Sequence, residues 1–462
     1  MKPRICLVFL LVLSFSGAAF AAPIPAEQTV ETLAPGLKHL VLEMGAAASG
    51  PSYRILLGVY DSQSEADVML DRLHANGFSA VLVADATTYR LVTPGTSDRA
   101  EAEEARRQLI DRGFSPPLEI QEIRNDLTNP TGPWKIHVLE ADPKTIKVRV
   151  AHAYDAAIGL ETTAALAHRR GAVAAINGGY FRMEGLLAGD SRGALRIDGR
   201  LLSEPDRGRA AVGFYDRDGI VRSVFGRLAF RGEVHLANGQ AIPLDGINRE
   251  REESEIILYT PDFHRTTLTS ADGAEVVIED GRIADIREGA GSSVIPCGGM
   301  VLSIGDERVG EVVPLMRRGA GISLQTKILP LLPDPEGEWG MAEHIVSGGP
   351  LLLWKGKRLE EPEKEAISRV FYLARHPRTA VGVRADGTLL FVTVDGRRPE
   401  ESVGMSIPEL TDLMLELGSV SAVNLDGGGS TTMVIGGEIV NHPSGASPRH
   451  NGDAILLYPK LR

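Results

Sequence analysis

Four short segments combine glycines with polar side chains directly after apolar runs. They are Asn177-Gly178-Gly179, then Gly348-Gly349 after Ser347, then Arg378-Thr379 leading to Asp395, and Asp426-Gly427-Gly428-Gly429 with Ser430 and Thr431. Glycines let a backbone approach a ligand closely and let consecutive amides converge on an anion. A guanidinium suits a phosphate diester, and a carboxylate can activate water. The four segments therefore indicate chemistry on an anionic substrate.

Each segment taken alone also has a purely structural interpretation. A triple glycine after a strand fits a tight turn, Asn177-Gly178 fits a hairpin turn, and Asp395 fits a turn former. A nucleotide-binding P-loop is disfavoured, because no lysine follows Gly427 to Gly429 and residues 433–440 predict a hairpin rather than a helix. The occurrence of four such segments in one chain favours a site over four unrelated turns.

No motif requires a cofactor, and the sequence identifies no metal ligands. Asp334, Glu336 and Glu338 alternate beside two prolines but lack the spacing of a calcium loop, which favours a solvated loop. A divalent cation is an open alternative. His376 and His442 are the histidines near these segments that could donate a proton.

The elements that must position these segments are mostly strands. A helix with a capping box at Ser406 and Glu409, closed by Gly418, joins two apolar strands at 389–394 and 422–425. The residues after both strands, Asp395 and Asp426, should then lie at one edge of a sheet. Further strands are predicted at 135–139, 146–151, 173–176, 256–259 and 275–278. Residues 134–462 are thus interpreted as one large mixed α/β domain, within an α+β chain.

The N-terminus predicts export. Lys2 and Arg4 precede an apolar run and a small-residue cleavage pattern ending at Ala21, which is typical of a signal peptide over residues 1–21. Beyond this leader no segment predicts a stable membrane span, and residues 22–50 are interpreted as linker. Cys297 is the one cysteine outside the leader, so no internal disulfide is expected. The net charge of −12 disfavours nucleic acid as a partner.

Residues 53–120 contain an internal repeat. Tyr53-Arg54-Ile55-Leu56 corresponds to Tyr89-Arg90-Leu91-Val92, and Gly77-Phe78 corresponds to Gly113-Phe114. Each copy predicts a strand, a helix that ends at its glycine, and a second strand, which together give a ferredoxin-like β-α-β-β-α-β module over residues 51–122. Thr93-Pro94-Gly95 in the second copy predicts a shortened third strand.

This module resembles the sporulation-related repeat (SPOR) domain, through the segments Tyr-Arg-Ile-Leu-Leu-Gly-Val-Tyr, Ser-Glu-Ala and Tyr-Arg-Leu-Val. The resemblance implies binding of peptidoglycan glycan strands on the open face of the sheet. A packing module of the same fold without a ligand is the alternative, because fold alone does not give function.

The four glycine segments, read in order as AINGGYF, SGGPLL, RTAVGV with VDGR, and NLDGGGSTTM, resemble the phosphodiester glycosidase family. The resemblance implies hydrolysis of a sugar, such as N-acetylglucosamine, linked through its anomeric oxygen to a phosphodiester. Arg378 and the amides of Gly427 to Gly429 would hold the departing phosphate. Asp426, or failing it Asp395, would activate water or support the oxocarbenium-like transition state.

The remaining site residues would bind substrate rather than react with it. Asn177 and Ser430 are expected to orient hydroxyls or phosphate oxygens. The other expected substrate-binding residues are Gly178, Gly179, Gly348, Gly349, Thr379 and Thr431.

The sequence as a whole predicts an exported, periplasmic or wall-associated hydrolase that its SPOR-like module tethers to a cell-wall or exopolysaccharide-related substrate. Two other functions fit the same residues. One is a non-catalytic protein that binds a glycan or a sugar phosphate, and the other is a phosphodiesterase that breaks P–O rather than C–O bonds.

Overall fold

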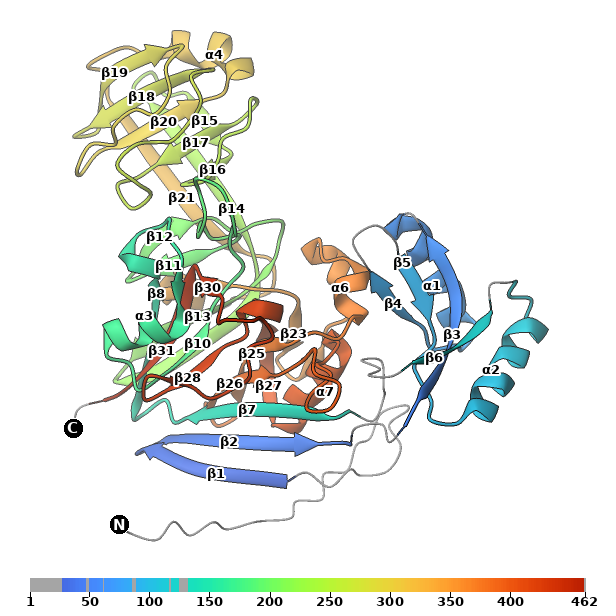
Figure 1. Cartoon of the computed structure of the whole chain (residues 1–462). Coiled ribbons are helices and arrows are strands. Elements are labelled where there is room, and N and C mark those ends of the chain that lie inside the picture. The colour runs from blue at the N-terminus through green and yellow to red at the C-terminus, as the bar shows by residue number, and fades with distance from the viewer. Residues whose placement is uncertain are drawn as a thin grey trace. The chain divides into compact units, whose positions relative to one another are not determined.

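The computed structural model describes residues 27–46, 50–60, 62–84, 89–115, 118–123 and 132–460. The predicted signal peptide, residues 1–21, lies outside these ranges. The chain divides into two compact units (Figure 1). Unit 1 runs to residue 146 and includes residues 352–433 and 439–449, whereas unit 2 comprises residues 147–351, 434–438 and 450–462. After residue 134 the chain crosses between the units several times, and the assignment of residues 134–462 to one domain stays a prediction.

Unit 1 is built on an eight-stranded sheet and a separate four-stranded sheet. The strands of the large sheet, in their order across it, are β1 (Glu27–Ala34), β2 (Leu37–Met44), β7 (Trp134–Ala141), β26 (Leu389–Val394), β25 (Arg378–Arg384), β27 (Ser419–Asn424), β23 (Leu351–Trp354) and β24 (Lys357–Arg358). Helices α6 (Arg369–Leu373) and α7 (Ile407–Glu416) also belong to this unit. The core contains Ile136, Val392 and Leu410 among other fully buried side chains.

The interpretation of residues 22–50 as a linker is wrong for the described part. Strands β1 and β2 form an antiparallel hairpin, and β2 pairs with β7 from Leu37 with Ala141 to Met44 with Trp134 (Figure 1). Leu37, Leu40, Leu42 and Met44 are buried. The signal for this hairpin was present in the sequence as the Pro35-Gly36 turn and the alternation of Leu40, Leu42 and Met44.

The four-stranded sheet lies between β2 and β7 in the sequence. Its elements are β3 (Ser52–Tyr60), α1 (Gln63–Ala75), β4 (Val81–Ala84), β5 (Tyr89–Val92), α2 (Arg99–Asp111) and β6 (Glu119–Ile123), with strand order β4-β5-β3-β6. Gly77 and Gly113 follow the two helices with φ near +80°, as the helix ends require. The prediction of a short third strand is confirmed, because β5 has four residues and β3 has nine. Since β2 and β7 pair directly with each other, this module is an insertion within the large sheet.

Unit 2 contains three larger sheets. The first holds β29 (Glu438–Ile439), β28 (Met433–Ile435), β10 (Ala174–Asn177), β31 (Asp453–Pro459) and β8 (Ile146–His152). The second holds β12 (Arg200–Ser203), β11 (Leu195–Ile197), β22 (His344–Ser347), β13 (Ala210–Arg217), β14 (Ile220–Leu236) and β15 (Ala241–Leu244), with β21 (Ile322–Pro330) paired to β14. The third holds β16 (Gly246–Ile247), β17 (Ile256–Tyr259), β20 (Met300–Ile304), β18 (Ala274–Glu279) and β19 (Arg282–Glu288).

The remaining elements of unit 2 are short. A two-stranded sheet pairs β9 (Glu161–Thr162) with β30 (His450–Asn451), and the helices are α3 (Thr163–Arg170), α4 (Asp306–Val312) and α5 (Glu338–Met341). The predicted hairpin after the triple glycine is confirmed by β28, Gly436-Gly437 and β29. No helix within the described residues is both long enough and apolar enough to cross a membrane.

Candidate functional site

The large sheet of unit 1 brings two of the four predicted segments to one edge: the segment that leads from Arg378 to Asp395 and the segment that begins at Asp426. Strand β25 lies between β26 and β27 and is antiparallel to both, with Arg378 opposite Val394 and Ala380 opposite Asn424. The residues that follow β26 and β27 therefore lie beside the start of β25. The capping box of Ser406 and Glu409 begins the connecting helix α7 as predicted. The expected meeting of Asp395 and Asp426 at one sheet edge is confirmed, and the intervening strand adds Arg378 to it.

Three glycines allow these segments to pack tightly together. A Cβ at Gly396 would lie 2.7 Å from the amide nitrogen of Pro377, and a Cβ at Gly427 would lie 2.7 Å from its carbonyl oxygen. A Cβ at Gly428 would lie 3.1 Å from Nη2 of Arg397. The first two glycines thus permit backbone packing, and the third permits a guanidinium to approach the loop.

Asp395 is buried and held by donors from the segment after β29. Its Oδ1 accepts hydrogen bonds from Nδ2 of Asn441 at 3.1 Å and from the amide of His442 at 3.0 Å, and its Oδ2 accepts from the same amide at 3.1 Å. Burial raises the pKa of Asp395, whereas these hydrogen bonds lower it. The side chain is 2% exposed, so in this arrangement Asp395 positions the 441–442 segment. Asp426 is partly exposed and accepts a hydrogen bond from the amide of Gly427 at 2.9 Å.

Arg378 does not reach the surface. Its side chain is 0% exposed, and its guanidinium donates to the carbonyls of Met405 at 2.8 Å, Phe371 at 3.0 Å and Ala374 at 2.7 Å. It also lies 4.6 Å from the centre of the Phe371 ring. A direct contact with phosphate would require this packing to open. The predicted phosphate ligand is therefore, in this structure, a residue that positions the 371–376 segment.

The glycine amides are also less available than predicted. The amide of Gly427 donates to Asp426, and the amide of Gly428 donates to the carbonyl of Pro377 at 2.8 Å. The loop continues as a single 3₁₀ turn over Gly428–Ser430. A nest formed by all three glycine amides is therefore not present, and any anion at this loop must be held mainly by other groups.

Two arginines that the sequence interpretation did not select supply those groups. A Cβ at Gly429 would lie 2.5 Å from Nη2 of Arg449, whose Nη1 lies 3.4 Å from Oγ of Ser430. Arg397 lies against Gly428 and 3.4 Å from Oγ of Ser444. Within the described ranges, no carboxylate oxygen lies within the 4.0 Å of an ion pair from either guanidinium. Burial and the nearby charge of Arg449 lower the pKa of Arg397, so the two cations lie within range of each other's charge.

His376 adjoins this arginine pair as a neutral imidazole. Burial, together with the charges of Arg378 and Arg397, lowers the pKa of His376 to about 4. Its Nδ1 lies 3.4 Å from Nη2 of Arg397, which makes Nδ1 the acceptor and leaves the proton on Nε2. His442 is exposed, and its Nδ1 lies 2.9 Å from Oε2 of Glu401. Both predicted histidines therefore lie near the loop, but His376 is a hydrogen-bond donor rather than an acid at neutral pH.

The hydroxyl residues of this edge are enclosed. Thr379, Ser430 and Thr431 are each at most 1% exposed. The carbonyl of Thr379 accepts the amide of Leu425 at 2.8 Å. Their predicted contact with substrate remains a prediction, and their observed contribution is to the packing beneath the loop.

The two other predicted segments meet in unit 2. Asn177 ends β10, and the amides of Gly178 and Gly179 donate to Asp453, the former to its carbonyl at 3.1 Å and the latter to Oδ1 at 2.8 Å. A Cβ at Gly179 would lie 2.5 Å from the carbonyl of Ser347. The Tyr180 hydroxyl donates to the carbonyl of Gly349 at 2.8 Å. The segments 177–180 and 347–349 thus form one loop cluster, organised by a buried aspartate whose pKa burial raises.

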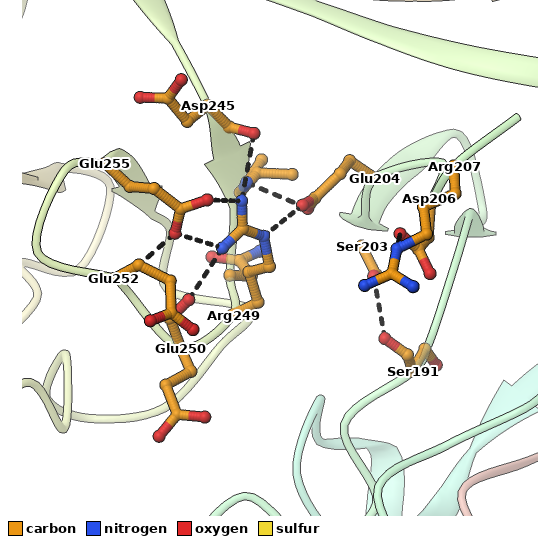
Figure 2. Close-up of polar contacts among 12 residues, drawn as sticks. Ser191, Ser203, Glu204, Asp206, Arg207, Asp245, Arg249, Glu250, Glu252 and Glu255 are labelled. Carbon is orange, nitrogen blue, oxygen red and sulfur yellow. Dashed lines mark hydrogen bonds and ion pairs between the residues drawn. The ribbon is translucent and has the colours of Figure 1, made fainter. Parts of the chain in front are cut away.

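A partly buried ion cluster lies elsewhere in unit 2 (Figure 2). Arg249 donates to Glu204 at 2.6 Å and to both oxygens of Glu255 at 2.7 and 2.8 Å. Oε2 of Glu204 also accepts the amide of Ile247 at 3.0 Å. Burial raises the pKa of Asp190 to about 7, and the charge of Glu204 adds to this shift. The cluster joins the segment after β12 to the segment between β15 and β17.

The described residues contain no group of three or more histidine, cysteine or acidic side chains that could hold a metal ion. Asp334, the first residue of the alternating acidic stretch, accepts a hydrogen bond at 2.9 Å from the amide of Glu338, the first residue of α5. The observed role of this carboxylate is helix capping.

Comparisons with known proteins identify two domains. Residues 272–458 match the family model described as phosphodiester glycosidase, and residues 49–121 match the SPOR domain model. Over 85 residues, 18% of this chain, the sequence is 36% identical to N-acetylglucosamine-1-phosphodiester alpha-N-acetylglucosaminidase of Bos taurus. Over 86 residues it is 40% identical to the SPbeta prophage-derived protein YomE of Bacillus subtilis. The chain spans 16% and 13% of the lengths of these two relatives.

The chain is similar over almost its whole length to a protein of known crystal structure. This protein, from Burkholderia pseudomallei, is named for its inferred export, and it matches with a TM-score of 0.72, 26% identity, and coverage of 98% of this chain and 100% of that one. Together the matches show that this chain carries a SPOR domain at residues 49–121 and a phosphodiester glycosidase domain that includes residues 272–458.

Proposed function

We propose that the protein is an exported hydrolase that cleaves the bond between a sugar, such as N-acetylglucosamine, and a phosphodiester in a cell-wall or exopolysaccharide-related substrate. The observation that carries this proposal is the pair Arg397 and Arg449. Both guanidiniums lie against the glycine loop without a carboxylate in ion-pair range among the described residues. Two such cations favour a phosphate group over a neutral sugar hydroxyl.

The two guanidiniums would stabilise the negative charge that develops on phosphate as the anomeric bond breaks. The phosphate monoester that departs leaves as an anion, so it needs less protonation than the alcohol released from an ordinary glycoside. The neutral His376 would donate its Nε2 proton as a hydrogen bond to a phosphate oxygen. Stabilisation of charge, rather than strong acid catalysis, then accounts for most of the rate.

Asp426 would be the carboxylate that activates water or supports the oxocarbenium-like transition state. It is partly exposed at the end of β27, whereas Asp395 is 2% exposed and has both oxygens occupied by donors. This difference favours Asp426 over Asp395 as the reacting group. For unit 2, taken by itself, substrate binding by its loop cluster of Asn177, Gly178, Gly179, Gly348 and Gly349 stays a prediction.

The SPOR domain implies peptidoglycan binding, and we propose that it is a ferredoxin-like module that anchors the enzyme to glycan strands. The N-terminal leader pattern and the SPOR domain both support an extracytoplasmic location. An anchored enzyme meets a polymeric substrate at a raised local concentration.

The test is hydrolysis of a synthetic N-acetylglucosamine alpha-1-phosphodiester by the mature chain, with products assigned by mass. Free sugar and a phosphomonoester, lost in Asp426→Asn but retained in the exposed control Asp218→Asn, would support the proposal. Release of sugar 1-phosphate would indicate P–O cleavage. Binding without turnover would indicate a sugar-phosphate binding protein. Parallel assays with EDTA and with added Mg²⁺ or Ca²⁺ would show whether a cation is needed.

A further inference from the structure

Unit 2 contains a pocket of about 320 Å³ that none of the four glycine segments lines. All of its lining residues belong to unit 2, and they come from β8, β13, β14, the start of β22 and the end of the chain. His344 begins β22 and Ser347 ends it, so the pocket and the loop cluster adjoin opposite ends of this strand. A pocket of this volume is at the small end of the roughly 300–1,000 Å³ typical of small-molecule sites. It would therefore hold one small molecule.

The lining of this pocket carries one net positive charge. It combines three cations with two carboxylates, and its other members are uncharged: Lys147, Arg149 and Lys460, then Asp216 and Glu343, then Val148, Phe214, Tyr215, Val221 and His344. Lys460 donates to the carbonyl of Gly219 at 2.8 Å and lies 3.5 Å from Oδ2 of Asp216. A ligand with a single negative charge would balance the pocket, whereas a dianion would leave it negative. The apolar residues of the lining suit a ligand with an organic body.

The guanidinium of Arg149 uses one nitrogen for protein contacts. Its Nη1 donates to Oδ1 of Asp198 at 2.8 Å and lies 3.5 Å from Oε2 of Glu343. Within the part of the chain that the structure describes, Nε and Nη2 of Arg149 have no hydrogen-bond partner. These two nitrogens form the edge of a guanidinium that binds both oxygens of a carboxylate at once. Arg149 is thus equipped for a bidentate contact.

His344 has a donor beside each of its ring nitrogens. Nδ1 lies 3.4 Å from the amide nitrogen of Asp198, and Nε2 lies 3.0 Å from Nη1 of Arg149. Burial and the charges of Arg149 and Lys147 lower the pKa of His344 to about 4, so the imidazole is neutral near pH 7. A neutral imidazole has one acceptor nitrogen and one N–H, so one N–H here faces another donor. Oδ1 of Asp198 lies 3.7 Å from Nε2, beyond hydrogen-bond distance.

Lys147 adds a second cation from the same strand. Residues 147 and 149 are two positions apart on β8, so their side chains leave the same face of the strand. Lys147 is exposed and makes no ion pair with any described residue. Its charge contributes to the lowered pKa of His344, which places the ammonium near this imidazole. The pocket therefore combines an unpaired ammonium, an open guanidinium edge and an imidazole N–H that lacks an acceptor.

We propose that this pocket binds the carboxylate of a small organic molecule. Nε and Nη2 of Arg149 would hold the two carboxylate oxygens, with Lys147 supplying a further charge-assisted contact. The carboxylate would also accept the Nε2 proton of His344, which leaves Nδ1 to accept the amide of Asp198. The apolar residues of the lining would contact the body of the ligand. This site is separate from the glycine loop of unit 1, and the inference does not depend on the proposed function.

A carboxylate of this kind can be part of a sugar acid or the end of a peptide, and two pairs of compounds distinguish these sources. The first pair is N-acetylmuramic acid with its neutral relative N-acetylglucosamine. The second is N-acetyl-D-alanine with its amide. Calorimetric titration of the mature full-length chain with each compound, and with inorganic phosphate, measures binding.

The variants are Lys147→Met and Arg149→Met, with Lys144→Met as the matched control. Lys144 is an exposed cation in the turn before β8 and does not line the pocket. Arg149→Met also removes the ion pair with Asp198, so its melting temperature is compared with that of wild type. Lys147→Met removes no ion pair, and its melting temperature should not change. This variant therefore tests the pocket without a change in stability.

We expect at least one carboxylate to bind and its neutral relative not to bind. Lys147→Met and Arg149→Met should each weaken this binding about tenfold, the scale for one hydrogen bond to a charged group, and Lys144→Met should not change it. Binding of the sugar acid would identify a glycan source, and binding of N-acetyl-D-alanine would identify a peptide source. Any binding of these compounds by the SPOR domain is common to all four proteins, so a difference between them reports on the pocket.

Three results would overturn the proposal. One is equal binding, or no binding, of the acidic and neutral members of both pairs. The second is an affinity for the carboxylate that Lys147→Met and Arg149→Met both leave unchanged. The third is tighter binding of inorganic phosphate than of either carboxylate, because it would assign the pocket to a different anion.

Discussion

The guanidinium of Arg449 occupies the space that a side chain at position 429 would need, since a Cβ on Gly429 would lie 2.5 Å from its Nη2. The positions of the glycine and the arginine are therefore coupled, although the two residues are 20 positions apart in the sequence. The glycine is required less for the freedom of its own backbone than for the position of this guanidinium. Arg397 has the corresponding relationship with Gly428.

Removal of either guanidinium should slow hydrolysis strongly. We expect Arg449→Met and Arg397→Met each to lower kcat/KM about 100-fold on the phosphodiester, the scale for losing one oxyanion-stabilising donor. Gly429→Ala should act through Arg449, so the double variant Gly429→Ala with Arg449→Met should be no worse than Arg449→Met alone. Arg398→Met is the matched control, because Arg398 lies 3.8 Å from Glu401. Additive losses in the double variant would contradict the coupling.

Arg378 should matter for folding rather than for binding. Its replacement by Met leaves the carbonyls of Met405, Phe371 and Ala374 without a buried donor. We expect the free energy of unfolding to fall by roughly 3 kcal/mol or more, measured by urea denaturation. The protein that remains folded should keep the KM of wild type. A raised KM without a loss of stability would instead indicate that Arg378 binds phosphate.

Asp190 should make unit 2 less stable as the pH rises. Its pKa is about 7 in the folded chain and 3.8 in its ordinary state. Between these values the folded protein retains a proton that the unfolded chain has lost, so stability falls as pH rises from about 4 to about 7. The full effect is roughly 4 kcal/mol, and Asp190→Asn should make the stability curve shallower by this amount. The pKa values of Glu204 and Asp453 are also raised, so the stability of Asp190→Asn will still depend on pH.

The measurement for Asp190 is chemical denaturation of both proteins at several pH values between 4 and 7.5. The exposed Asp218→Asn variant, the same change of carboxyl to amide, is the control. Parallel curves for wild type and Asp190→Asn would contradict the prediction.

Deletion of the hairpin β1–β2 should destabilise unit 1. The hairpin pairs with β7 through β2, and its side chains Leu37, Leu40, Leu42 and Met44 are buried. At about 1.5 to 3 kcal/mol for each fully buried apolar side chain, the loss exceeds roughly 5 kcal/mol. It also exposes β7 as a sheet edge, which promotes aggregation. We expect a chain that starts at residue 50 to melt earlier and to elute as oligomers on gel filtration. A monomer with unchanged melting temperature would show that the hairpin is dispensable.

The sequence predicted the features that depend on local pattern. The helix capped by Ser406 and Glu409, the strands on either side of it, and the edge shared by Asp395 and Asp426 all follow from short-range spacing. The positions of Arg397 and Arg449 do not, because they depend on packing between segments that are distant in the chain. Arg378 shows the converse error. A charged residue before a buried strand looks like a ligand in the sequence, yet its Nε and Nη2 donate to three backbone carbonyls.

The insertion of the SPOR domain between β2 and β7 gives it two covalent attachments. Met44 and Trp134, on either side of the insertion, are paired in the large sheet. A single proteolytic cut in either connection would therefore leave the SPOR domain joined to the sheet by the other one. Mechanical load on this domain would enter at both strands at once, at the Met44–Trp134 pair, and β2 and β7 would share it.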